Sequence, residues 1–61
     1  MEELRKKFKK VYSNLPLGIR KEIILVVGKE PVTWSVIWLE VDQRTETGNE
    51  MLRLLKKLRL I

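Results

Sequence analysis

Apolar and charged positions along the first fifteen residues alternate with the period of a helix. The charged side holds Glu2 four residues before Lys6, an arrangement that stabilises helices. Pro16 restricts the residue before it and has no backbone N–H, so we expect the helix to end near Asn14. The apolar side of this predicted helix consists of Met1, Leu4, Phe8, Val11, Tyr12 and Leu15.

Two apolar segments separated by turn residues predict an antiparallel hairpin. Residues 22–27 are short, apolar and rich in β-branched side chains, which is typical of a buried strand. Residues 28–31 read Gly-Lys-Glu-Pro and form either a two-residue II′ turn, begun by Gly28, or a longer loop. The second strand is expected over residues 32–42. Both turns place the same side chains on each face, so the hairpin is predicted in either case.

The predicted second strand carries large apolar side chains on both faces. Trp34 and Trp38 share one face, whereas Ile37, Leu39 and Val41 share the other. Its C-terminal half also extends beyond the first strand. A chain of 61 residues hardly covers both faces of such a strand, so this segment predicts a surface that contacts a partner.

A second amphipathic helix is expected at the C-terminus. Thr47 and Glu50 have the spacing of a capping box, and Thr45 is a rival N-cap. The wide apolar stripe that follows consists of Met51, Leu52, Leu54, Leu55, Leu58 and Ile61. We therefore predict one α+β domain over residues 1–61, in the order α-β-β-α. Its hairpin is packed by N- and C-terminal amphipathic helices.

Composition excludes several kinds of site. The chain has no Cys and no His, so disulfides and ordinary zinc, haem or iron–sulfur ligation are not expected. We predict no cofactor, no metal and no small-molecule ligand. The charged N-terminus lacks the apolar region of a signal peptide, and no apolar run approaches the ~20 residues that span a membrane. The sequence therefore favours a soluble, cytoplasmic protein without a membrane partner.

Candidate catalytic chemistry is sparse, and we expect no enzymatic activity. The two serines have no base to activate them. Glu40 and Asp42 would point the same way from a strand and could hold a metal or transfer protons, but no other residue completes such a site. Trp34 and Trp38 could stack on bases, although the acids that continue their face favour packing instead.

A second copy of the chain is the leading predicted partner. An isolated two-stranded hairpin is weak, and the edge of a long apolar strand is an association site. Two copies could pair edge to edge through their second strands, which would then lie at the centre of a four-stranded sheet, or pack face to face. The predicted dimer interface consists of Trp34, Ile37, Trp38, Leu39 and Val41. The leading function is a non-enzymatic, homodimeric interaction module.

Nucleic acid is the alternative partner. The net charge is +5, and it is concentrated at the two ends of the chain, with +3 in residues 1–10 and +3 in residues 44–61. The bland interpretation is that these basic faces only keep a small protein soluble. The candidate contacts are Lys6, Lys7, Lys9, Lys10, Arg53, Lys56, Lys57 and Arg59.

Three segments carry a resemblance to known proteins. Residues 14–22 (Asn-Leu-Pro-Leu-Gly-Ile-Arg-Lys-Glu), residues 31–34 (Pro-Val-Thr-Trp) and residues 38–41 (Trp-Leu-Glu-Val) are similar to segments of small uncharacterised archaeal proteins. The similarity spans most of the chain but includes no functional motif. It implies no activity and no site residues.

Overall fold

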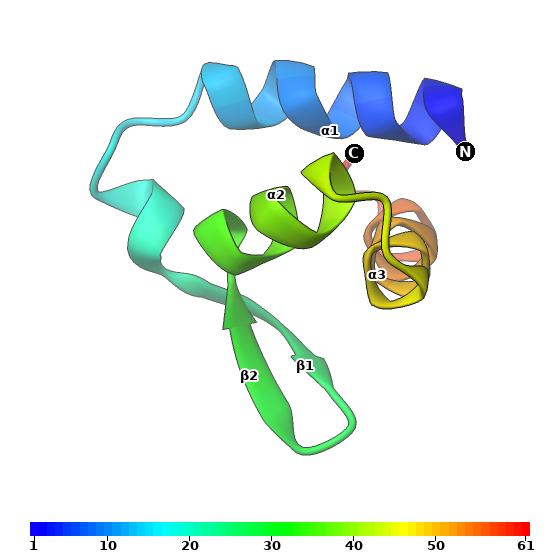
Figure 1. The fold of residues 1–61 in the computed structure, drawn as a ribbon. Helices are drawn as coiled ribbons and strands as arrows, with labels where there is room; N and C mark the ends of the chain where they lie inside the picture. Colours follow the sequence, from blue (N-terminus) through cyan, green and yellow to red (C-terminus); the bar gives the residue numbers. More distant parts are fainter.

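The computed structural model describes residues 1–61 (Figure 1). Its elements are α1 (Glu2–Ser13), the single 3-10 turn η1 (Ile19–Lys21), β1 (Ile23–Val27), β2 (Glu30–Thr33), α2 (Trp34–Asp42) and α3 (Glu46–Lys57). The predicted α+β class is confirmed, with one antiparallel hairpin between N- and C-terminal helices. A further helix, α2, follows the hairpin directly. No helix combines the length and the apolar character that a membrane span requires.

The first helix, α1, forms where the sequence predicts it. Glu2 lies in its first turn and Lys10 in its last turn, as the helix dipole favours. The helix ends at Ser13, and the Asn14 side chain closes it by donating to the Lys10 carbonyl at 3.0 Å. Phe8 is fully buried on the apolar side, which fixes the face that α1 turns toward the core.

The hairpin closes with a two-residue turn, so the longer of the two predicted loops is wrong. Val27 pairs with Glu30 across Gly28 and Lys29. Gly28 has a φ of 64°, a left-handed conformation that a first turn position of type II′ requires and that glycine adopts without strain.

The two faces of the hairpin differ in burial. Leu25 and Val32 pair with each other and enter the core. The register shifts between Ile23 and Leu25, and this irregularity turns Ile23 outward. Val26 pairs with Pro31, and both are exposed. The segment 22–27 is therefore not a strand buried on both faces, because its outer face is open to solvent.

The predicted strand over residues 32–42 is wrong beyond Thr33, because residues 34–42 form helix α2. Thr33 is its N-cap, and the Thr33 hydroxyl accepts a hydrogen bond from the Val36 N–H at 3.2 Å. Four apolar side chains then share one side of the helix at positions i, i+3, i+4 and i+7: Trp34, Ile37, Trp38 and Val41. A strand would have divided these four between two faces, whereas the helix turns all of them inward.

The N-cap of the last helix, α3, is Thr45 rather than Thr47. The Thr45 hydroxyl accepts from the Gly48 N–H at 2.9 Å, so the interpretation of Thr47 and Glu50 as a capping box is wrong. The turn before α3 depends on Arg44, which adopts a φ of 56°. The helix ends at Lys57, earlier than the apolar stripe suggests, because the chain turns back at Arg59 with a φ of 59°.

Helix α2 lies at the centre of the fold. It packs against α1, α3, η1 and β2, and α1 also contacts α3. In Figure 1, α1 lies above α2 and is only slightly inclined to it, α3 is seen end-on beside α2, and the hairpin projects away from the helices. The core consists of Phe8, Leu25, Val32, Ile37, Val41, Met51, Leu52 and Leu55.

Substitutions in α2 test this arrangement. Ile37 is 0% exposed and Leu39 is 49% exposed on the same helix. Ile37→Ala removes a fully buried side chain and should lower the free energy of unfolding by about 2–5 kcal/mol. Leu39→Ala, the matched control, should lower it by less than about 1 kcal/mol. Urea denaturation of both variants checks this, and equal losses would contradict the helical assignment.

Candidate functional site

The residues predicted to form a dimer interface occupy different environments. Ile37 is fully buried and Val41 is 1% exposed, so the chain's own core already covers both side chains. Trp34 and Trp38 are partly buried and pack against that core. Of the five, only Leu39 is exposed. The structure therefore separates these five residues instead of placing them on one open face.

The two tryptophans belong to a cluster that contains every aromatic side chain of the chain. The Phe8 ring lies 6.0 Å from the rings of both Tyr12 and Trp34, and the Tyr12 ring lies 5.9 Å from that of Trp38, measured between centroids. The Lys9 ammonium is 5.8 Å from the centroid of Trp38. These separations are typical of internal aromatic packing. The rings join α1 to α2 and do not form an open platform for bases.

A set of polar contacts connects η1 to the aromatic cluster. The Arg20 guanidinium lies over the Tyr12 ring, 4.5 Å from its centroid. The Ser35 hydroxyl donates to the Arg20 carbonyl at 3.0 Å and lies 3.3 Å from the Tyr12 hydroxyl. Because the single Ser35 proton is used by that carbonyl, Tyr12 donates to Ser35. Ser35 thus has a structural role.

The junction of α2 and α3 is unusually close. A Cβ placed on Gly48 would lie 2.6 Å from the Glu40 carbonyl oxygen, a distance that no side chain tolerates. The Thr45 hydroxyl donates to the Glu40 carboxylate at 2.6 Å, and the Thr45 N–H donates to the Glu40 carbonyl at 3.2 Å. Glycine at position 48 therefore allows α3 to start directly against the end of α2.

Glu40 and Asp42 do not converge on a common site. They lie on a helix, where residues two apart point in different directions, so the expectation that they share a strand face is wrong. Glu40 accepts the Thr45 hydroxyl, whereas Asp42 pairs with Lys9 at 3.0 Å. No three His, Cys, Asp or Glu side chains lie close enough together to hold a metal ion.

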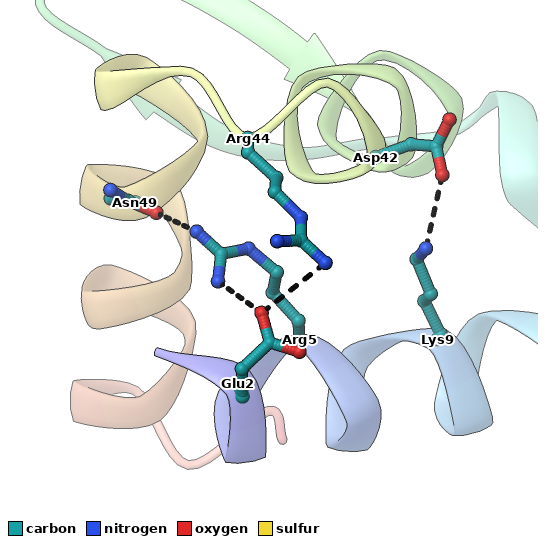
Figure 2. Close-up of polar contacts among 6 residues, drawn as sticks. All are labelled: Glu2, Arg5, Lys9, Asp42, Arg44 and Asn49. Atoms are coloured by element: carbon teal, nitrogen blue, oxygen red, sulfur yellow. Dashed lines mark hydrogen bonds and ion pairs between the residues drawn. The ribbon is translucent and has the colours of Figure 1, made fainter.

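An ionic cluster ties the start of α1 to the α2–α3 turn (Figure 2). Arg5 donates to the Glu2 carboxylate at 2.7 Å and to the Asn49 amide oxygen at 3.0 Å. Arg44 lies 3.6 Å from the same carboxylate. The Arg5 hydrogen bond, and then the charge of Arg44, lower the pKa of Glu2 below its ordinary value of 4.5.

The basic residues considered for nucleic-acid binding are mostly free. Lys9 forms an ion pair with Asp42 and lies over the Trp38 ring. The other seven are exposed and form no ion pair. They lie on α1, on the second half of α3 and just after α3. Glu46 and Glu50 are exposed in the first half of α3. The one surface hollow in the structure is lined by Glu50, Arg53, Leu54 and Lys57, and thus mixes both charges.

Sequence reasoning missed the exposed apolar side chains of the hairpin. Ile23 and Val26 are 63% and 62% exposed on the outer face of β1. Val36 and Leu39 are exposed on α2. Pro31 is the signal that could have found the outer face, because proline marks the edge or the solvent side of a strand.

Comparisons with protein-family models, with curated proteins and with solved structures found no match to this chain. The resemblance to archaeal proteins therefore receives no support from them.

Substitution of Gly48 tests the α2–α3 junction. Gly48→Ala forces a Cβ onto the Glu40 carbonyl and should lower the free energy of unfolding by about 2 kcal/mol or more. Gly18→Ala is the matched control, since nothing lies within 4 Å of its added Cβ and its φ of −63° suits alanine. Thermal unfolding of both variants provides the measurement, and a tolerated Gly48→Ala would show that the helices are not this close.

The Glu2 cluster makes a prediction for pH. Because the pKa of Glu2 is lowered in the folded chain, its contribution to stability is present at and above pH 4.5 and disappears as the pH falls through the lowered value. Arg44→Gln should raise this pKa toward 4.5, and Arg59→Gln, outside the cluster, should not. Titration of the Glu2 carboxyl by carbon-13 NMR measures the difference. An unchanged Glu2 pKa in Arg44→Gln would argue against the cluster.

Proposed function

We propose that this chain is a small, non-enzymatic interaction module of the cytoplasm that acts as a homodimer. One observation carries the proposal: nine large apolar side chains are exposed, whereas the core contains only eight. They are Met1, Leu17, Ile19, Ile23, Val26, Val36, Leu39, Leu58 and Leu60. A surface with this many apolar groups favours association, because each contact with a partner removes apolar area from water.

The small sheet supports the same proposal. Two strands rarely suffice for independent stability, and small domains bury too little surface to be robust alone. Association with a second copy would add buried area and make stability depend on protein concentration. In a homodimer, the second copy itself would supply the apolar surface that covers these side chains.

Sedimentation equilibrium tests the proposal. We expect a particle of twice the 7.3 kDa chain mass, with dissociation on dilution, and a thermal midpoint that rises with protein concentration. A single 7.3 kDa species over the whole concentration range, with a constant midpoint, would contradict homodimerisation.

Nucleic-acid binding is the second candidate, and the short turn between α2 and α3 favours it. Only residues 43–45 join the two helices, and Figure 1 shows that α3 crosses α2 instead of running alongside it. Helix-turn-helix proteins join two helices in this way and place the second in the major groove. Glu46 and Glu50 oppose this role, because they would face phosphates or base edges at the start of α3.

A salt titration separates the two candidates. Binding through phosphates requires log affinity for duplex DNA or RNA to fall steeply with log salt concentration. Lys56→Gln with Lys57→Gln should then weaken binding and reduce the slope, whereas Lys29→Gln in the hairpin turn should not. The absence of binding at low salt would remove this candidate and leave the homodimer proposal intact.

A further inference from the structure

The outer edge of β1 has unused backbone hydrogen-bonding groups. Val27 and Glu30 close the turn as a hydrogen-bonded pair, so the next pair, Val26 and Pro31, is not hydrogen-bonded. The N–H and C=O of Val26 therefore point away from β2. The sheet has only two strands, and no other backbone hydrogen bond reaches residues 23–27. This edge is consequently a ready template for another strand.

The outer edge of β2 is less suited than that of β1 to pairing with a further strand. The group that should donate there belongs to Pro31, which has no backbone N–H. Glu30 adds a charge beside it, and the strand ends after four residues where α2 begins. Pairing two copies through β2 would therefore lose one backbone donor in each copy.

The charges around β1 favour a second copy in antiparallel orientation. Residues 23–27 carry no charge, so a symmetric contact brings no like charges together. Glu22 precedes the strand and Lys29 follows it, and both are exposed. In an antiparallel pair, Glu22 of each copy lies at the same end of the sheet as Lys29 of the other copy. Opposite charges therefore meet at both ends. Parallel pairing would instead place each residue beside its own copy.

We infer that β1 pairs antiparallel with β1 of a second copy and forms a continuous sheet in the order β2-β1-β1-β2. This inference rests on the proposed homodimer and specifies its interface. The outward side chains of Ile23 and Val26 from both copies would form one apolar strip on this sheet. The order differs from the edge-to-edge arrangement expected from the sequence, which placed the second strand at the centre.

A substitution that removes one N–H provides the test. Val26→Pro deletes the outward donor, yet it leaves the ladder with β2 intact because the Val26–Pro31 pair is not hydrogen-bonded. We expect its dimer dissociation constant to rise by at least about 100-fold, with the helical circular dichroism retained. Val26→Thr, the matched control, keeps the N–H and a β-branched side chain, and it should remain dimeric. Leu39→Lys, on the exposed side of α2, should also remain dimeric.

Amide exchange of the wild-type chain gives an independent readout that does not depend on any variant folding. The Val26 N–H has no partner in a single chain, so its exchange should slow by at least about tenfold between concentrations below and above the dissociation constant. A wild-type dimer with an unprotected Val26 amide, or a dimeric Val26→Pro, would overturn this interface while leaving self-association standing. A wild-type monomer at every concentration would overturn both.

Discussion

Burial of one side of α2 is the interaction on which the rest of this structure depends. Ile37 and Val41 occupy the centre of the core, and the tryptophans that share their side of the helix join it to α1 through the aromatic cluster. The helix packs against α1, α3, η1 and β2 at the same time. In a chain with eight core side chains, loss of α2 would leave the hairpin and the two long helices without a common support.

Polar contacts then fix how the elements around α2 are joined. Glu40 meets both the Thr45 hydroxyl and its backbone N–H, and Gly48 leaves room for this approach. The ion pairs of Lys9 and Glu2 lie largely at the surface, where such pairs contribute little to stability. They connect α1 to the end of α2 and to the turn before α3. Apolar burial thus supplies most of the stability, and short-range polar contacts select the arrangement.

The sequence predicted the parts of the fold that have a single consistent signal. The stripe of α1, the stop before Pro16 and the buried positions of the α3 stripe agree with the structure. The turn at Gly28 is the shorter of the two forms that were predicted. Residues 34–42 gave two signals: their β-branched and aromatic side chains favour a strand, whereas the spacing of Trp34, Ile37, Trp38 and Val41 suits a helix. Packing of that stripe against α1 and α3 decided the outcome, and no local preference contains this information.

The same ambiguity governs what could be predicted of the site. Read as a strand, residues 34–41 left apolar groups uncovered on two faces, and the predicted interface was placed there. As a helix, the segment covers its largest side chains within the chain, whereas two apolar side chains of β1 are exposed and its outer edge has no neighbouring strand. Helical periodicity alone places the long basic side chains on the surface, and most of them are exposed in the structure.

Isotope-filtered NOE spectroscopy on a mixture of labelled and unlabelled chains tests the central claim most directly. If α2 covers its stripe internally and β1 carries the interface, contacts between chains should connect backbone protons of residues 23–27 with the same segment of the second copy. Contacts between chains that instead involve the side chains of Ile37 and Val41, with none across β1, would contradict this account.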